Sequence, residues 1–226
     1  MNLRRTLRRW HLWLGWLVGV PLLLWTLSGF VMVLKPIEEV RGAELLAPLA
    51  PVRLAGPALL PSEIAGLPLA KVTLEPRVAG PRWVIEVQGG PTRLADPATG
   101  RLVPPLSAAE ASAEVQARWR GTGGIAGVTR TSADDPPLDL RRETEAWQVR
   151  MADGTHLYVE AASGRILATR TRWWRIYDLM WGLHIMDLRG REDTHHPLLV
   201  GFAAFSLLTV LLALVLLPLS TRRRRS

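Results

Sequence analysis

The sequence predicts an α+β membrane protein in which two transmembrane helices flank an exported domain. This domain is predicted to consist of two similar units, each a helix followed by a small antiparallel sheet. Three observations support the prediction. Two long apolar runs lie near the chain ends, four arginines stand beside each run, and the stretch between the runs contains a pattern that recurs after 64 residues.

The net charge of +8 comes entirely from the two ends of the chain. All 20 acidic residues and 20 of the 28 Lys and Arg residues lie between Lys35 and Asp193, so this stretch is neutral. The other eight cations are Arg4, Arg5, Arg8, Arg9, Arg222, Arg223, Arg224 and Arg225. A neutral middle argues against nucleic-acid binding, which needs clustered cations in the binding domain. The lack of cysteine excludes a disulfide scaffold, thiolate metal sites and a thiol nucleophile.

The two apolar runs, residues 12–34 and 197–219, are predicted to span the membrane. Each has 23 residues without a charge, and a bilayer core of about 30 Å needs about 20 helical residues. The first run is too long for a cleaved signal peptide and is interpreted as an uncleaved anchor. By the positive-inside rule, residues 1–11 and 220–226 are cytoplasmic and residues 35–172 are exported. In a bacterium with two membranes, this places the spans in the inner membrane and the domain in the periplasm.

The exported stretch contains a duplication. Residues 83–87 (WVIEV) read as a strand, and 64 residues later stands WQVRM. Residues 96–102 form a predicted turn whose counterpart, also 64 residues on, is 160–166; Gly100 and Gly164 supply the positive φ of a tight turn. Preceding strands at 72–74 and 128–130 are offset by 56. Ser107 and Glu110 form a capping box that opens a helix over 107–119, and a shorter counterpart begins at Pro61. The units span about 61–104 and 107–170.

The chain resembles the PepSY-associated transmembrane proteins. A short helix followed by strands that end in an acidic residue, a small turn and Gly is similar to the PepSY pattern. The segments Arg8-Arg9-Trp10-His11-Leu12-Trp13-Leu14-Gly15, Asp178-Leu179-Met180-Trp181-Gly182-Leu183-His184 and His195-His196-Pro197-Leu198 resemble the family's membrane motifs. Some relatives look like inner-membrane ferric-siderophore reductases that carry b-type haem on four spans, where this chain has two. The resemblance therefore implies a membrane-anchored PepSY protein and raises haem as a cofactor.

Four of the five histidines lie at the predicted membrane edges, His11 on the cytoplasmic side and His184, His195 and His196 on the exported side. These four are the candidate haem-iron ligands; the alternative for His11, His195 and His196 is that they are interfacial residues that reach toward the head groups. A 23-residue span is about 35 Å long, so His11 cannot share an iron with the others and needs a second chain. The expected pair is His184 with either His195 or His196. His156 is expected to be an exposed strand residue.

Three local features bear on ligation. Asp193 or Thr194 is expected to cap the second span, whose N-terminus would keep a nearby imidazole neutral. Gly15, four residues after His11, either admits a flat macrocycle or forms a small-residue helix contact together with Gly19. Residues 173–188 are too short and too charged to span, and suit an amphipathic interfacial helix. By the helical period of 3.6 residues, one face of this helix contains Tyr177, Trp181, His184 and Leu188.

The sequence contains no phosphate loop, serine-nucleophile motif or zinc signature. The leading hypothesis is a non-catalytic accessory or partner-binding module that is anchored in the lipid bilayer and acts on a protein partner or as a homodimer. The alternative is a b-haem electron-transfer protein related to the ferric-siderophore reductases. On this reading the chain is an enzyme only as a haem-dependent component of a ferric reductase, and it binds no nucleic acid.

Overall fold

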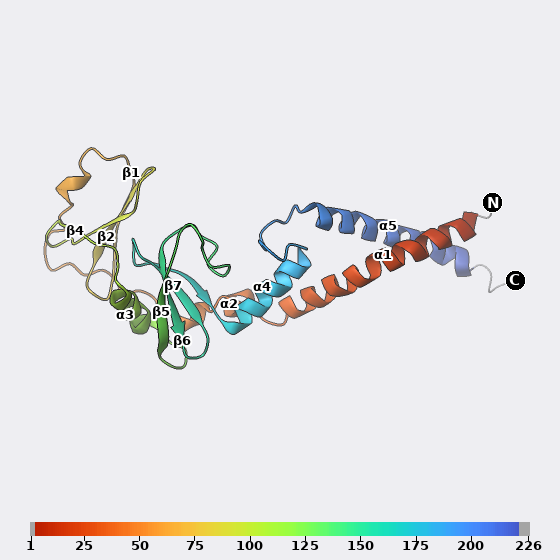
Figure 1. The fold of residues 1–226 in the computed structure, drawn as a ribbon, viewed down its shortest axis with the longest axis horizontal. Coiled ribbons are helices and arrows are strands. Elements are labelled where there is room, and N and C mark those ends of the chain that lie inside the picture. Colours follow the sequence, from red (N-terminus) through yellow and green to blue (C-terminus); the bar gives the residue numbers. More distant parts are fainter. Residues whose placement is uncertain (1–2, 222–226) are drawn as a thin grey trace. The chain divides into compact units, whose positions relative to one another are not determined.

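The structure, a computed structural model, describes residues 3–221 and divides into two compact units (Figure 1). The helical unit comprises the chain up to Pro36 and from Ile176 onward. The double-sheet domain comprises Ile37–Arg175. The predicted cytoplasmic cluster formed by Arg222, Arg223, Arg224 and Arg225 lies outside the described residues.

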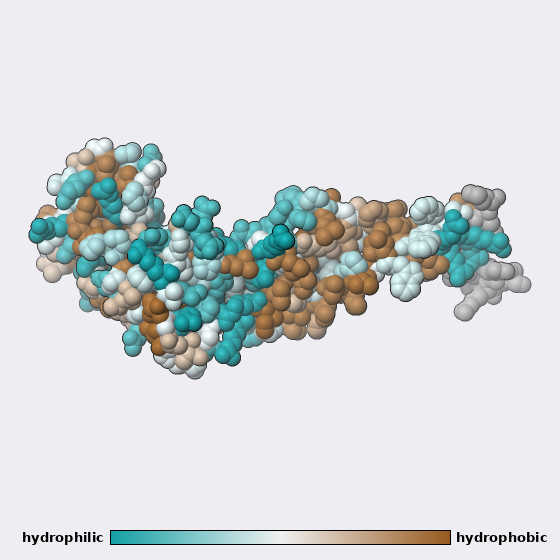
Figure 2. All heavy atoms as spheres, viewed as in Figure 1, coloured by the Kyte–Doolittle hydropathy of each residue, from teal (hydrophilic) through white to brown (hydrophobic). Residues whose placement is uncertain are grey.

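Two long helices form the helical unit and run antiparallel side by side (Figure 1). They are α1 (Leu3–Met32) and α5 (Pro197–Thr221). Both helices are long and apolar enough to cross a membrane, few of their residues are buried in the described chain, and apolar spheres gather over both (Figure 2). They correspond to the two predicted spans. Helix α1 begins nine residues before the predicted span because nothing between Leu3 and Leu12 breaks a helix, so Arg4, Arg5, Arg8 and Arg9 are helical.

A third helix, α4 (Arg172–His184), precedes α5 and replaces the longer interfacial helix expected over 173–188. It ends at His184 because the chain turns sharply, with a positive φ of 58° at Met186. Leu188 therefore lies outside the helix, and the predicted four-residue face is cut to three positions.

The double-sheet domain contains two four-stranded antiparallel sheets with the same strand order. The first is β1 (Leu69–Glu75), β2 (Arg82–Val87), β3 (Arg93–Ala95) and β4 (Leu102–Val103). The second is β5 (Ile125–Thr131), β6 (Ala146–Met151), β7 (His156–Glu160) and β8 (Ile166–Arg170). Helix α3 (Ala108–Arg118) separates them; the short helices are α2 (Ile37–Val40), η1 (Ala43–Leu45) and η2 (Ser62–Ile64).

The two sheets repeat each other down to single hydrogen bonds. The β1–β2 and β5–β6 ladders have an irregularity at the same place, between Leu69 and Lys71 and between Ile125 and Gly127. The indole N–H of Trp83 donates to the Leu59 carbonyl at 2.8 Å. That of Trp147 donates to the Leu106 carbonyl at 2.7 Å. The strand offsets of 64 and 56 differ by eight residues, and the β5–β6 loop (132–145) is eight residues longer than the β1–β2 loop (76–81).

Within the double-sheet domain, the repeat that contains the second sheet has the larger core, because a full helix covers that sheet. The Ser107–Glu110 capping box starts α3 as predicted, and Ala111 and Val115 of this helix pack against one face of the second sheet. In the repeat that contains the first sheet, the counterpart of α3 is only the 3₁₀ turn η2, whose Ile64 packs on Ile85 and Ala95. The first sheet is therefore covered by less apolar side chain than the second.

The longer β5–β6 loop folds over the other face of the second sheet. Leu140 from this loop packs against Ala146, Tyr158 and Ala168. The Tyr158 hydroxyl donates to the Asp139 carboxylate, and burial together with this bond raises the pKa of Tyr158. His156 was expected to be exposed, but it is partly buried and its Nδ1 lies 3.2 Å from Asp139. The expectation is wrong because the β5–β6 loop covers this strand, and the residue pattern of a strand does not show whether a distant loop packs on it.

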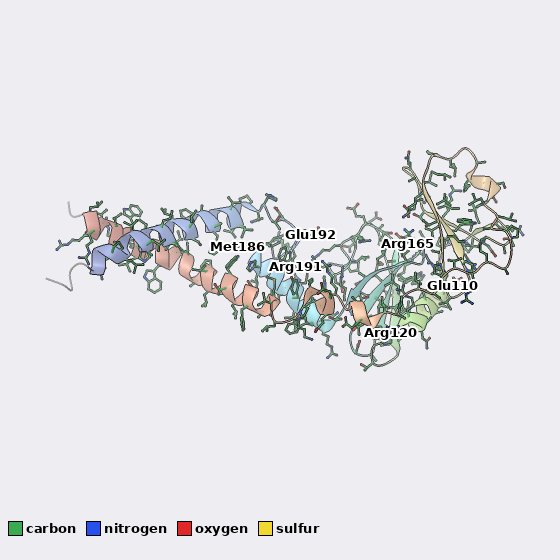
Figure 3. All side chains as sticks on the ribbon, turned by 180° about the vertical axis from the view of Figure 1, so that it is seen from behind. Glu110, Arg120, Arg165, Met186, Arg191 and Glu192 are labelled. Carbon is green, nitrogen blue, oxygen red and sulfur yellow. The ribbon has the colours of Figure 1, made fainter. Side chains whose placement is uncertain are left out.

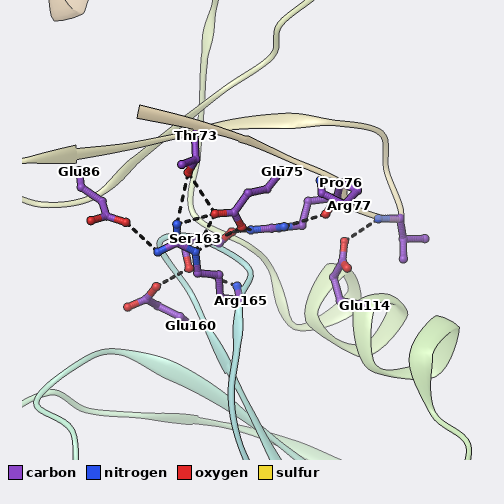
Figure 4. A network of polar contacts seen from close by, with 10 residues as sticks. Thr73, Glu75, Pro76, Arg77, Glu86, Glu114, Glu160, Ser163 and Arg165 are labelled. Atoms are coloured by element: carbon purple, nitrogen blue, oxygen red, sulfur yellow. Dashed lines mark hydrogen bonds and ion pairs between the residues drawn. The ribbon is translucent and has the colours of Figure 1, made fainter. Parts of the chain in front are cut away.

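A polar network joins the two sheets (Figure 4). Arg165, in the β7–β8 turn, donates from Nη1 to Glu86 at 2.7 Å and from Nε to Glu75 at 2.9 Å. Arg77 also pairs with Glu75, at 2.8 Å, and donates from Nε to the Ser163 carbonyl at 3.0 Å. Burial alone would raise the pKa of Glu75, but the two arginines outweigh it and lower that pKa to about 2. Glu75 is therefore a carboxylate that fastens one sheet to the other.

Candidate functional site

The His184 ring is held against α1 by three contacts. Its Nδ1 lies 3.2 Å from the Trp25 carbonyl oxygen and 3.1 Å from Ser28 Oγ. The ring stacks on the Trp25 indole with centroids 4.3 Å apart. A Cβ added to Gly29 would lie only 3.2 Å from the imidazole Cε1, so the absent side chain makes room for the ring. The end of α4 is thereby fixed to α1.

These contacts determine which ring nitrogen carries the proton. A carbonyl oxygen only accepts, so Nδ1 must be the donor toward Trp25. Ser28 gives its own hydroxyl proton to the same carbonyl at 2.8 Å, which leaves Ser28 Oγ free to accept from Nδ1 as well. Neutral His184 therefore has its proton on Nδ1 and a lone pair on Nε2. Histidines that ligate metals use this arrangement, in which a backbone carbonyl holds the other nitrogen.

An apolar hollow of about 470 Å³ adjoins the imidazole. It is lined by Leu22, Trp25, Trp181, His184, Ile185, Leu199, Phe202, Ala203 and Ser206. Ser206 Oγ is buried with no hydrogen-bond partner in the described part of the chain, whereas the neighbouring Thr209 donates back to the Phe205 carbonyl. The hollow thus combines an apolar wall with an imidazole and an unpaired hydroxyl, as small-molecule sites do.

The segment after α4 is held in place by two carboxylates. Arg191 Nη1 pairs with the buried Asp178 at 2.6 Å, and the Trp181 indole donates to the Arg191 carbonyl at 3.1 Å. Asp187 accepts from the backbone N–H groups of Gly190 at 3.0 Å and Glu192 at 3.2 Å, and bonds of this kind lower the pKa of Asp187 to about 2. Met186, Arg191 and Glu192 all belong to this segment (Figure 3).

The cap of α5 differs from the prediction. The helix begins at Pro197, so His196 takes the cap position instead of Asp193 or Thr194, and its Nδ1 accepts the Leu198 N–H at 3.3 Å. The proton of neutral His196 is therefore on Nε2, which disfavours this nitrogen as a ligand. Asp193 instead accepts the His195 N–H at 2.8 Å. The cap was misplaced because Asp and Thr are commoner caps than His.

The structure does not bring the four candidate histidines together. Within residues 3–221, neither His195 nor His196 makes a hydrogen bond or ring contact with His184, and no group of three metal-ligating side chains occurs. His11 lies at the opposite end of α1, beside Ala213, Leu216 and Leu217 of α5. The pairing of His184 with His195 or His196 remains a prediction.

Sequence reasoning missed the residues that define the site. Ser28, Gly29 and Ser206 are polar or small positions inside apolar runs, and such positions are a known signal of function within a membrane. The sequence points instead to Gly15 and Gly19, but a Cβ at either would meet nothing within 4 Å among the described residues. The close approach therefore occurs at Gly29, toward His184.

Comparison with protein families gives one match. The model of the PepSY-associated TM region matches residues 8–225, which include the apolar stretches of both long helices and the whole double-sheet domain. Comparison with curated proteins gave no match. Comparison with solved structures also gave none. Because the match covers nearly the entire sequence, the chain belongs to the family of the PepSY-associated TM region.

Proposed function

We propose that the protein is an inner-membrane-anchored accessory module whose double-sheet domain binds a protein partner in the periplasm, with both termini in the cytoplasm. The observation that carries this proposal is a free strand edge. Strand β1 pairs only with β2 in the described chain, and its first residues, Leu69, Ala70 and Lys71, are exposed. An open edge of this kind is a template on which another chain adds a strand.

The network around Arg165 supports the same proposal. It fastens the first sheet to the second through Glu75 and Glu86, so the β1 edge is presented on a rigid body. A preorganised edge loses less entropy when a partner strand docks than a flexible one does. The four arginines at the start of α1 support the orientation, because cations remain on the cytoplasmic side.

The chain has only two lysines, Lys35 and Lys71, which allows a sharp test. Spheroplasts are treated with a membrane-impermeant amine crosslinker, and adducts are identified by mass spectrometry. We expect a crosslinked species that Lys71→Arg abolishes and Lys35→Arg retains. A species of twice the 25.1 kDa chain mass identifies a homodimer, and another mass identifies a different partner. A chain that the reagent does not modify at all contradicts the orientation. Modification of Lys71 without a crosslinked species contradicts docking at β1.

The second candidate function is haem ligation with electron transfer, favoured by the His184 geometry. With its Nδ1–H held by the Trp25 carbonyl and a lone pair on Nε2, His184 would be able to hold the haem iron. Among the other candidates, His195 keeps Nε2 unengaged in the described contacts, whereas His196 uses Nδ1 as an acceptor. His11 would serve a separate group, completed by another chain. Bound b-type haem supplies one-electron transfer, and this chain's contribution is to orient the imidazole and exclude water with its apolar wall.

Haem ligation is tested by absorbance of the full-length protein purified in detergent after growth with a haem precursor. If haem binds, we expect a Soret band that shifts with dithionite. His184→Ala should reduce that band at least about tenfold, the size of effect seen when a metal ligand's environment is lost. His156→Ala, in the second sheet, is the matched control and should retain the band. A wild-type protein without a Soret band contradicts haem ligation, and the accessory module then remains as the proposed function.

A further inference from the structure

A basic hollow of about 430 Å³ lies at the end of the helical unit remote from His184. Three positively charged or hydrogen-bonding side chains of α1 line it, Arg4, Arg8 and His11. The residues are spaced by four and three along a helix, so they share one face. The opposite wall is apolar and comes from Ala213, Leu216 and Leu217 of α5.

The described chain provides no anion for this hollow. No carboxylate pairs with Arg4 or Arg8 within residues 3–221, and His11 Nδ1 is buried without a hydrogen-bond partner. The acidic residues of the sequence all lie between Glu38 and Asp193, away from both ends. A buried ring nitrogen without a hydrogen-bond partner is unfavourable in the protein alone, and the two guanidinium groups beside it have no carboxylate partner within residues 3–221. This combination is what an anion-binding site looks like before its ligand is present.

We propose that this hollow binds the phosphate head group of an acidic membrane phospholipid. Guanidinium groups donate in a fork that matches two phosphate oxygens, and the His11 ring, which also lines the hollow, supplies a third donor. The apolar wall selects a lipid over a soluble anion, because it continues along α5, whose surface is exposed and apolar. Basic pockets between transmembrane helices hold acidic head groups in this way.

The site gives His11 a role within one chain. As a haem ligand, His11 needs a partner from a second copy or another subunit. As a phosphate donor it needs only Arg8 and Arg4, which lie about one and two turns away on the same helix. The lipid site is independent of the strand edge in the double-sheet domain, so it holds whether or not a partner docks there.

The test is native mass spectrometry of the full-length, delipidated protein in detergent, titrated with phosphatidylglycerol or with phosphatidylcholine. We expect wild-type protein to retain phosphatidylglycerol in preference to phosphatidylcholine. The double variant Arg4→Gln/Arg8→Gln should bind it about tenfold or more weakly, because both guanidinium groups that line the hollow are lost. The matched control is Arg5→Gln/Arg9→Gln, which removes the same charge from other faces of α1 and should bind within about twofold of wild type.

Two further measurements keep the proposal falsifiable. His11→Phe keeps an aromatic ring but removes the donor, and should weaken phosphatidylglycerol binding several-fold, whereas Trp10→Phe should not. Millimolar inorganic phosphate should fail to displace the lipid; displacement identifies a soluble phosphate site and overturns the lipid assignment. Equal weakening in both double variants means that only bulk charge attracts the lipid, which also overturns the proposal. Circular dichroism confirms that each variant retains its helices.

Discussion

Replacing Arg165 with Met is expected to cost the double-sheet domain about 2–3 kcal/mol of unfolding free energy. Removing one partner of a buried ion pair costs roughly 3–5 kcal/mol, because the remaining charge is left without compensation. Arg165 is 33% exposed, so water screens part of the loss. Two carboxylates, Glu75 and Glu86, would lose this cation at once. The measurement is thermal unfolding of the full-length protein in detergent, followed by limited proteolysis of the domain.

The duplication supplies the control for this variant. Arg101 occupies the equivalent position in the first unit, 64 residues earlier, and its side chain is exposed. Arg101→Met should therefore change the unfolding free energy by less than about 0.5 kcal/mol. Equal losses in both variants would mean that the turn itself, and not the contact between the sheets, sets the stability.

The same contact has a defined pH dependence. The pKa of Glu75 falls from 4.5 to about 2 in the folded protein, so its contribution is complete above pH 4.5 and is lost as the pH falls toward 2. Arg165→Met removes the partner whose hydrogen bonds lower the pKa most, and should flatten this acid limb of the stability curve. An unchanged acid limb in the variant would contradict the assigned role of Arg165.

Trp147→Ala is expected to cost about 3–4 kcal/mol, the usual loss when a large core aromatic is truncated. The indole packs on the core between α3 and the second sheet, and its N–H bond to the Leu106 carbonyl ties the start of α3 to β6. Trp83→Ala, the equivalent change, should cost less, about 2–3 kcal/mol, because only η2 covers that sheet. Both losses are measured as lowered unfolding temperatures and faster proteolysis.

A lipid-facing tryptophan separates the core effect from a general effect of losing an indole. Trp16 of α1 is 80% exposed, so Trp16→Ala should leave the unfolding of the double-sheet domain unchanged. If Trp83→Ala proves as costly as Trp147→Ala, the two cores are equally well packed. The expectation that η2 protects its sheet less well than α3 does is then wrong.

Residue patterns that act locally were readable in the sequence. The capping box at Ser107 and the paired strands around Trp83 and Trp147 are where the pattern predicts them. So are the two apolar helices, because a run of lipid-facing residues needs no tertiary partner to be recognised. The eight-residue difference between the strand offsets of 64 and 56 is also visible in the sequence, and it corresponds to the greater length of the β5–β6 loop relative to the β1–β2 loop.

Features that depend on contacts between distant segments were not readable. Nothing in the sequence marks Arg165 as the residue that joins two sheets while its equivalent, Arg101, remains exposed. Likewise, the anchoring of His184 by Trp25 and Ser28 joins segments separated by 159 and 156 residues. The histidine was selected as a candidate because of its place at a membrane edge. The tautomer of His184 and the apolar hollow beside its ring depend on contacts that form only in the folded chain.

The Arg165 contact also sets an order of events during folding. Glu75 is synthesised 90 residues before the arginine that neutralises it, and Glu86 is synthesised 79 residues before. Until Arg165 emerges, the first sheet has its smaller core and carboxylates without that cation, so it is the less stable half of a nascent chain. Closing a loop of this length is slow compared with forming a local hairpin. The first sheet is therefore synthesised first but gains its full set of contacts only after the second sheet has been made.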